Sequence, residues 1–251
     1  LYVASKKKKT LPIILQEQNS FPGITTRLFS DKAKKICVAF NDSKKEPDPK
    51  TIFTGNPIRK GIENGNISKG LKEFRFIENK KIIFLFGGSQ GSAYLNKMMN
   101  KIVSKISNAG IQILWQTGDL EYNQYKIMNS DSVRVVQFVN NMDDAYAVSD
   151  LLICRSGALT LAEITVCGKP SILIPFPHAA GDHQTKNAKA LVNAGAARIF
   201  IEKSLNSNDL LHTIMNLIHD KKELDRMGLA SRALGKPNAT REIVDNIFEV
   251  L

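Results

Sequence analysis

The chain has 251 residues, of which 43% are hydrophobic, so it can form one large domain or two modest domains with apolar cores. Its apolar runs are all far shorter than the roughly 18 residues that a membrane-spanning helix needs, so no such helix is expected. The formal net charge of +11, from 35 basic and 24 acidic side chains, favours polyanions as partners.

The first 50 residues carry more than half of this positive excess. They contain 11 Lys or Arg against 5 Asp or Glu, a balance of +6, and Lys6–Lys9 form a continuous basic run. A solvated surface and a docking surface for an anionic membrane are both consistent with this pattern. Nucleic acid is not an expected partner, because the single Trp and the five Tyr do not interleave with the basic runs.

Apolar runs alternate with amphipathic stretches along the whole chain. The runs predict strands at residues 12–15, 36–40, 51–55, 81–86, 111–116, 133–138, 151–155, 171–176 and 197–202. The amphipathic stretches predict helices at 22–35, 89–108, 119–129, 157–167, 183–194, 207–218, 221–234 and 239–250. This alternation indicates an α/β fold with a mostly parallel sheet, in which ligands bind beyond the C-terminal ends of the strands.

A division of the chain is expected within residues 55–80, where glycines, asparagines and an Asn-Pro step interrupt regular structure. Residues 1–55 offer three strands and one helix, too little for an ordinary independent domain of this class. Residues 56–235 are expected to form a complete nucleotide-binding half. Residues 236–251 are expected to form a helix that packs back toward the first part.

The stretch FLFGGSQGSA, residues 84–93, leaves a strand through glycines and enters a helix. It lacks the lysine of the Walker loop, and Phe86 stands at the first glycine position of the dinucleotide fingerprint. Glycines still let the backbone approach a ligand, and free N–H groups at a helix N-terminus attract anions. A tight turn without a ligand is the alternative.

A second strand, turn and helix follow the same logic in LLICRSGALTLAEITVCG, residues 151–168. We expect Ser156 to cap the helix and the N–H groups of residues 157–160 to form an anion site. Glu163 lies on the same helix and can accept both hydroxyls of a ribose. Electrostatic stabilisation of the helix start is its alternative role.

A third polar loop follows the strand at 171–176. Asp182 is expected to cap the next helix, which places Gln184 and Asn187 near the loop. Amide side chains both donate and accept hydrogen bonds, which suits sugar hydroxyls. His183 fits a surface or capping role better than a catalytic role.

The three cysteines are scattered and form no C-x-x-C pattern. Cys37, Cys154 and Cys167 are therefore expected to be free thiols in a reducing cytosolic setting, mostly buried rather than catalytic. No group of His, Cys, Asp and Glu has the spacing of metal ligands, so neither a metal nor a cofactor is expected.

Seven stretches together resemble one known family. They are QEQNSFPG (16–23), TGNPIR (54–59), GGSQGSAYLN (87–96), WQTG (115–118), VVQFVNNM (135–142), CRSGALTLAEI (154–164) and PFPHAAGDHQTKNA (175–188). In this order they resemble the MurG enzymes of glycosyltransferase family 28, peripheral membrane proteins that add N-acetylglucosamine to lipid-linked muramyl pentapeptide. The resemblance implies the GT-B fold, two Rossmann-like halves that face each other across a cleft.

The resemblance also implies a site for UDP-N-acetylglucosamine. The residues carried over are Asn19 from the N-terminal half, Arg59, Ser89, the backbone of Val139 at the uracil, the stretch Ala158, Leu159, Thr160, Leu161, Ala162 and Glu163 at phosphate and ribose, and Gln184 at the sugar. Transfer to the lipid-linked muramyl-pentapeptide acceptor would proceed with inversion, at the cytoplasmic face of the inner membrane. The leaving pyrophosphate would be stabilised by helix N-termini rather than by a metal.

One departure from the family concerns its opening GGTGGH turn, which serves the acceptor side. This chain starts at Leu1, after that region, as a fragment or a shortened gene product would. The acceptor site and the general base are therefore not assigned. A UDP-sugar-binding remnant without turnover is one alternative. A UDP-N-acetylglucosamine 2-epimerase is another, which CRSGALTLAE and DHQTKNA fit less well.

Overall fold

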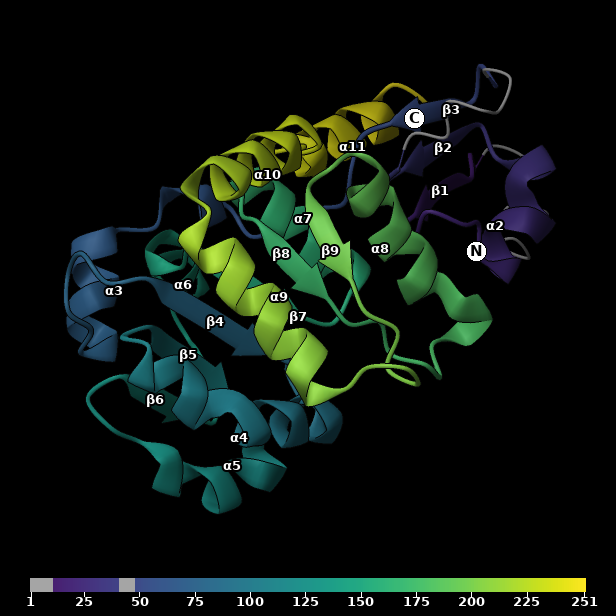
Figure 1. Ribbon diagram of the computed structural model, residues 1–251. Helices are drawn as coiled ribbons and strands as arrows, with labels where there is room; N and C mark the ends of the chain where they lie inside the picture. Colours follow the sequence, from purple (N-terminus) through teal and green to yellow (C-terminus); the bar gives the residue numbers. More distant parts are fainter. Residues whose placement is uncertain (1–10, 41–47) are drawn as a thin grey trace.

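The computed structural model describes residues 11–40 and 48–251, and it contains two parallel β-sheets surrounded by helices (Figure 1). The predicted basic run Lys6–Lys9 lies outside the described residues. Within the described part, the smaller sheet has the order β1-β2-β3 and the larger, six-stranded sheet has the order β6-β5-β4-β7-β8-β9. The strands are β1 Ile14–Glu17, β2 Lys35–Val38, β3 Thr51–Phe53, β4 Ile82–Phe86, β5 Gln112–Gln116, β6 Val133–Val136, β7 Leu151–Cys154, β8 Ser171–Leu173 and β9 Ala197–Ile199.

Helices cover both faces of the larger sheet. The helices are α2 Ile24–Phe29, α3 Ile67–Phe74, α4 Ala93–Asn108, α5 Asp119–Tyr125, α6 Met142–Val148, α7 Ala158–Cys167, α8 His183–Asn193, α9 Ser207–His219, α10 Lys221–Ala233 and α11 Ala239–Phe248. Apolar side chains of α4, α9 and α10 form the core on one face, and those of α3, α6, α7 and α8 form the core on the other.

The central strand β4 shows why its sequence does not alternate between apolar and polar residues. All five of its residues are buried. Ile83 and Leu85 belong to the core on the first face, whereas Phe84 and Phe86 belong to the core on the second. Because successive side chains point to opposite faces, a strand covered on both faces must be apolar throughout.

The C-terminal helix α11 returns to the smaller sheet (Figure 1). Lys35 of β2 donates to Asn246 Oδ1 at 2.7 Å and forms an ion pair with Glu249. The segment between β1 and α2 contacts α8, because Ser20 N donates to Asn187 Oδ1 at 2.8 Å. The division of the chain into parts at residues 55–56 and 235–236 stays a prediction.

The predicted α/β class and parallel sheet are confirmed, and every predicted strand segment overlaps a strand of the described chain. Two helices, α3 and α6, were not predicted. Helix α3 falls in the stretch expected to be irregular, and both helices are short. They stabilise each other, since the buried Asp144 carboxylate of α6 accepts from Asn66 N at the start of α3 at 2.6 Å.

Glycines in that stretch allow close packing rather than breaking the structure. A Cβ on Gly65 would lie 1.9 Å from the backbone oxygen of Asp143, and one on Gly70 would lie 2.8 Å from that of Asp144. The backbone of α3 can therefore approach α6 only because these positions carry no side chain. This contact between distant segments is what the local sequence pattern does not reveal.

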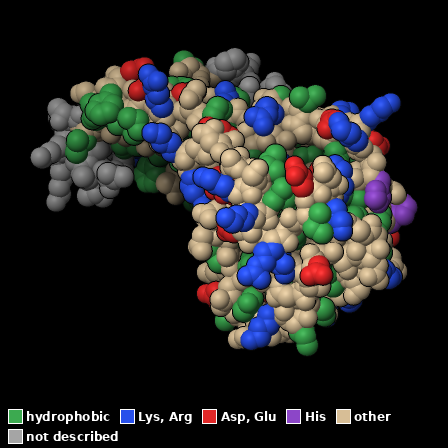
Figure 2. All heavy atoms as spheres, turned by 90° about the vertical axis from the view of Figure 1, so that its left-hand side faces the viewer, with side chains coloured by type: hydrophobic (Ala, Val, Ile, Leu, Met, Phe, Trp, Pro, Cys, Tyr) green, Lys and Arg blue, Asp and Glu red, His purple; other side chains and the backbone are tan. Residues whose placement is uncertain are grey.

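The positive charge is distributed over the surface. Figure 2 shows Lys and Arg side chains spread across one face of the molecule, with a few Asp and Glu side chains between them. Among the described residues, no helix combines the length and the apolar character that crossing a membrane requires.

A buried polar network supports the end of β5. Trp115 Nε1 donates to Asn96 Oδ1 at 2.8 Å, and Asn96 Nδ2 donates to Thr117 O at 2.9 Å and to Glu121 Oε2 at 2.6 Å. Trp115 and Asn96 are 0% and 1% exposed, so water cannot replace either partner.

The variant Asn96→Leu should lower the free energy of unfolding by about 1–3 kcal/mol, because it leaves the indole N–H unpaired in the core. Urea denaturation followed by the fluorescence of Trp115, the single Trp, measures this change. Asn100→Leu, on the exposed side of the same helix, is the control. Equal stability of Asn96→Leu and the native chain would contradict this account of the network.

The three cysteines are free and buried, as predicted. Burial raises the pKa of Cys37 and Cys154, and it raises the pKa of Cys167 to about 12. The thiolate is the reactive form of cysteine, so all three should be inert at neutral pH.

Ellman's reagent should therefore label none of the thiols of the folded protein within the time in which it labels all three after denaturation. Rapid labelling of one thiol without denaturant would show that a cysteine is accessible and ionised, which would reopen a catalytic role for it.

Candidate functional site

The two predicted glycine turns lie next to each other in space. They follow β4 and β7, which are hydrogen-bonded neighbours in the larger sheet. The strand order reverses between these two strands, since β5 and β6 lie on one side and β8 and β9 on the other. Such a reversal opens a crevice at the C-terminal ends of parallel strands, where α/β proteins bind ligands.

The first turn, residues 87–92, depends on glycine at Gly91. Its φ is +79°, and a Cβ there would lie 2.0 Å from the backbone oxygen of Thr117. Ser92 caps helix α4, and its Oγ accepts from Leu95 N at 3.4 Å. Ser89 lies exposed on the turn, where a ligand can reach its hydroxyl.

Gln116 at the end of β5 joins the first turn to Val139. Its Nε2 donates to Gly88 O and its Oε1 accepts from Val139 N, both at 2.9 Å. The N–H of Val139 is therefore already used inside the protein. Gln116 was not predicted as a site residue, although it lies in WQTG, one of the stretches that carry the family resemblance.

Arg155 in the second turn connects it to the first. Its Nη1 donates to Ile174 O and Pro175 O, both at 3.0 Å, and its Nη2 donates to Ser92 Oγ at 2.9 Å. It also forms an ion pair with Glu202 at 2.6 Å. These contacts fix the start of α4 relative to the end of β8.

The expected cap by Ser156 is wrong. Helix α7 has Gly157 at its N-cap position and no side-chain cap, and Ser156 Oγ instead donates to Gln184 O at 2.8 Å. The first N–H groups of α7 therefore donate to no capping side chain. They lie at the positive end of the helix dipole, where an anion is stabilised.

Glu163, one turn further along α7, already has two partners. Its Oε2 accepts from Tyr146 OH at 3.0 Å, and its Oε1 accepts from Arg59 Nε at 3.1 Å. Burial and the Glu163 carboxylate raise the pKa of Tyr146 well above its ordinary value, so the phenol stays a donor. Tyr146 was not predicted, and nothing in the local pattern around it indicates that it holds Glu163.

The first turn of α8 and the segment after β1 contribute amide side chains, those of Gln184 and Asn19. Gln184 Oε1 accepts from Phe176 N at 3.0 Å, which orients its side chain. Asp182 occupies the N-cap position of α8 but makes no side-chain cap hydrogen bond. Asn19 Oδ1 accepts from Asn187 Nδ2 at 3.0 Å, so Asn19 lies against α8.

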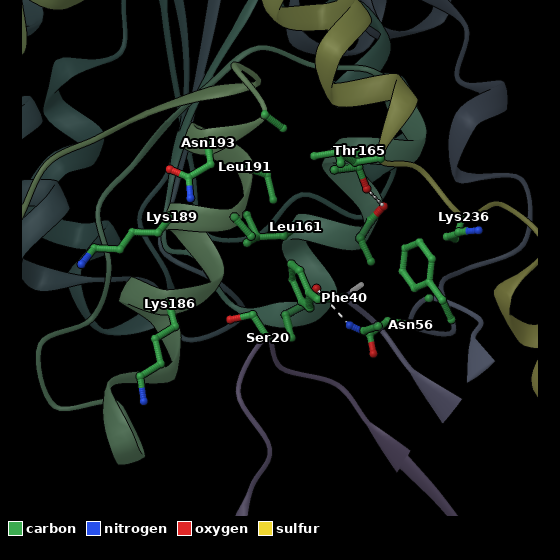
Figure 3. A pocket seen from close by; sticks show the side chains of 18 of the residues that line it. Ser20, Phe40, Asn56, Leu161, Thr165, Lys186, Lys189, Leu191, Asn193 and Lys236 are labelled. Carbon is green, nitrogen blue, oxygen red and sulfur yellow. Dashed lines mark hydrogen bonds between the residues drawn. The ribbon is translucent and has the colours of Figure 1, made fainter. Parts of the chain in front are cut away.

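The predicted stretch from Ala158 to Glu163 is helical, and the helix distributes it over different sides. Ala158, Leu161 and Ala162 line a cavity beside α8 (Figure 3). Leu159 is 51% exposed. The structure thus brings Arg59 to Glu163. It places Asn19 against α8, whose first helical turn carries Gln184. Ser89 and Val139 are connected through Gln116, which bonds to the glycine turn that contains Ser89 and to the backbone of Val139. The contact of each of these residues with a ligand stays a prediction.

Within the described part of the chain, no cluster of three or more His, Cys, Asp or Glu side chains could hold a metal ion.

Known proteins resemble the chain both in sequence and in structure. The C-terminal domain of glycosyltransferase family 28 matches residues 82–246. A UDP-N-acetylglucosamine--N-acetylmuramyl-(pentapeptide) pyrophosphoryl-undecaprenol N-acetylglucosamine transferase of Flavobacterium psychrophilum is 38% identical over 242 residues, which cover 95% of this chain and 66% of that protein. The transferase of the same name from Finegoldia magna is 38% identical over 259 residues, covering 100% and 70%.

Solved structures of related proteins have the same fold as this chain. The crystal structure of MurG from Acinetobacter baumannii matches with a TM-score of 0.81 and 28% identity, over 98% of this chain and 69% of that one. A UDP-GlcNAc 2-epimerase from Neisseria meningitidis, bound to UDP-GlcNAc, matches with a TM-score of 0.67 but only 15% identity, which shows a shared fold alone.

The chain spans about two thirds of the length of the relatives that it matches, with shares of 66% and 70% for the two transferases. It has the α/β GT-B fold, and it matches the C-terminal region of MurG together with part of the N-terminal domain. The chain belongs to glycosyltransferase family 28, as a MurG-like member.

Proposed function

We propose that the chain binds UDP-N-acetylglucosamine at the two glycine turns. In this proposal it transfers N-acetylglucosamine from this donor to undecaprenyl-pyrophosphoryl-N-acetylmuramyl-pentapeptide, lipid I. The product is lipid II, which is used in peptidoglycan synthesis. The observation that carries the proposal is the pairing of the two turns on β4 and β7, with the uncapped start of α7 beside them. The 38% identity to transferases with this substrate in their name supports it.

The pyrophosphate of the donor would lie at the start of α7. The N–H groups of its first turn, which no side chain caps, and the helix dipole favour a dianion there. Arg59 lies close by, and its side chain is 55% exposed, so the guanidinium is accessible to a phosphate oxygen. As the bond to the sugar breaks, charge develops on the leaving UDP, and fixed donors stabilise it without reorganisation.

The ribose would lie against Glu163. The carboxylate is held by Tyr146 on one oxygen and by Arg59 on the other, so it is oriented before the donor arrives. Each carboxylate oxygen can accept more than one hydrogen bond, which leaves capacity for ribose hydroxyls. Gln184, in the first turn of α8, would contact the sugar. The hydroxyl of the acceptor would attack the anomeric carbon with inversion.

The direct test of the transfer step is an assay with UDP-N-acetylglucosamine and a lipid-linked muramyl-pentapeptide acceptor. Formation of the disaccharide product with release of UDP supports the proposal. Calorimetric binding of UDP-N-acetylglucosamine without any product would retain the donor site and contradict transfer by this polypeptide. That result would favour a UDP-sugar-binding protein without turnover.

Glu163→Gln and Gln184→Ala should each weaken the binding of UDP-N-acetylglucosamine by about 1–3 kcal/mol, because each leaves polar groups of the donor unpaired. Glutamine is chosen at position 163 because its amide oxygen can still accept from Tyr146 OH, which separates the ligand contact from the stability of the core. Calorimetry measures the affinities, with Glu78→Gln on the surface as the control. Native affinity in both variants would remove these residues from the donor site.

We further propose that α2 and its surroundings dock on the cytoplasmic surface of an anionic membrane. Phe21, Ile24 and Leu28 are 47%, 69% and 65% exposed, and Arg27 and Lys34 lie nearby in the chain. Apolar side chains beside basic ones suit the interface between lipid headgroups and acyl chains. The basic excess of residues 1–50 would add an electrostatic attraction that salt screens.

Leu28→Ser should reduce co-sedimentation with vesicles of phosphatidylglycerol and phosphatidylcholine, and raising the salt concentration should reduce it further. Leu120→Ser is the matched control, because Leu120 is 93% exposed but lies on α5, which follows β5 of the larger sheet. If both serine variants and the native chain bind vesicles equally, α2 is not the docking element. Binding that does not respond to salt would contradict the electrostatic part.

A further inference from the structure

A cavity of about 750 Å³ lies between the two sheets, next to α7 and α8 (Figure 3). Its walls come from the ends of β2 and β3, from α7 and α8, and from the connection between α10 and α11. This size is within the range of sites that bind small molecules. Neither the proposed donor contacts nor the proposed membrane contact account for most of its wall.

The floor of the cavity is apolar. Phe40 and Phe53 come from the smaller sheet, and Leu161, Leu191 and Leu234 come from the helices. Polar groups on this floor are already used: Asn56, for example, donates to Gln18 O at 2.9 Å and accepts from Gln16 at 2.8 Å. The floor therefore suits the apolar part of a ligand.

The rim of the cavity is cationic. Lys186 and Lys189 lie along α8 on one side, and Lys236 lies on the opposite side (Figure 3). Among the described residues that line the cavity, none is Asp or Glu. The positive charge at this rim is thus not balanced by an acidic side chain of the lining.

Two of these lysines are held in place by aromatic rings. Lys236 Nζ lies 4.2 Å from the centre of the Phe53 ring. Lys186 Nζ lies 3.7 Å from the centre of the Phe21 ring and donates to Gly181 O at 3.0 Å. The side chain of Lys189, in contrast, makes no hydrogen bond, ion pair or ring contact within the described part of the chain.

A second unpartnered group lies in the same wall. Ser20 Oγ is a buried oxygen that has no hydrogen-bond partner among the described residues. Ser20 lines the cavity on the side of α8 (Figure 3). A buried hydroxyl without a partner is costly, so a ligand oxygen that accepts from it would remove that cost.

The cavity shares Ala158, Leu161 and Ala162 of α7 with the stretch expected at the donor, but the rest of its wall lies outside the proposed donor site. Ala158, Leu161, Ala162 and Thr165 recur at the spacing of one helix face, and this face lines the cavity. Glu163 is directed instead toward Tyr146 and Arg59. Of the polar residues proposed for the donor, Arg59, Ser89, Glu163 and Gln184 are all absent from the cavity lining.

We propose that this cavity is a second binding site, which takes a single-chain anionic amphiphile such as an alkyl phosphate. The alkyl chain lies against Phe40, Leu161 and Leu191, where burial of apolar surface drives binding. The anionic head lies at the α8 rim, where it accepts from Lys189 and Ser20 Oγ. A neutral amphiphile lacks the partner for Lys189, and a free anion lacks the contact with the floor.

The test is a calorimetric titration of the 251-residue chain with decyl phosphate below the concentration at which it forms micelles. Saturable binding is expected, whereas decanol and inorganic phosphate should not bind in the same concentration range. Lys189→Glu should weaken the binding of decyl phosphate about tenfold or more, because a charge-assisted contact becomes a repulsion. Lys101→Glu, the same charge change on the exposed side of α4, should leave the affinity unchanged.

A second variant tests the apolar part of the site. Ala190→Phe places a ring in the cavity from α8 and should abolish the binding of decyl phosphate while the thermal unfolding midpoint stays near that of the native chain. If this variant unfolds, Leu234→Ser, which makes the floor polar, serves in its place. Native affinity in either folded variant would overturn the proposal.

Further titrations separate the alternatives. Saturating UDP should not prevent the binding of decyl phosphate, and competition between the two would show that the cavity is part of the donor site. Equal loss in Lys189→Glu and Lys101→Glu would show attraction by net charge alone. Binding to phosphatidylglycerol vesicles that depends on Lys189, without binding of decyl phosphate, would assign this rim to a membrane surface and overturn the proposal.

Discussion

The arrangement of the candidate site depends on the contacts of one buried group, the guanidinium of Arg155. It bonds to the backbone at the end of β8, to the capping residue of α4 and to Glu202, and it lies 5.9 Å and 5.6 Å from the ring centres of Tyr94 and Phe176. A guanidinium has five N–H donors in a rigid plane, so one side chain can fix several segments at once. The strand, the helix start and the loop that surround the second turn are thereby held together without the help of a ligand.

Two carboxylates in the stretches that resemble the family, Glu163 and Glu17, are likewise held by donors from several segments. Glu163 is oriented by Tyr146 and Arg59. Burial alone would raise the pKa of Glu17, but hydrogen bonds from Thr26, Gly23 and Asn19 outweigh this effect and lower it. Glu17 therefore stays ionised and holds the loop that presents Asn19 to α8. In both cases a carboxylate is fixed by donors from separate elements before any substrate binds.

The sequence revealed the strands and the two turns because their signals are local. A run such as IIFLF in β4 can be fully apolar only if both of its faces are covered, and glycine followed by a capping residue marks the exit from a strand. Helices α3 and α6 escaped prediction because their stability comes from the contact between Asn66 and Asp144, which are far apart in the sequence. The roles of Gln116, Tyr146 and Arg155 likewise depend on strand neighbours that no local pattern specifies. Serine is a common capping residue, which is why the sequence predicts a cap at Ser156. Its hydroxyl instead donates to the backbone oxygen of Gln184 in α8.

The return of the chain to the smaller sheet through α11 has a mechanical consequence. The chain passes between the two sheets once after β3, at Gly55, and again before α11, at Lys236. These two passages touch, since a Cβ on Gly55 would lie 2.4 Å from Lys236 Cβ. Because these two connections lie side by side, a rotation of one sheet relative to the other about this point would not stretch the chain. The hydrogen bonds of Asn187 with Asn19 and Ser20 lie across the same boundary, so such a rotation would have to break them.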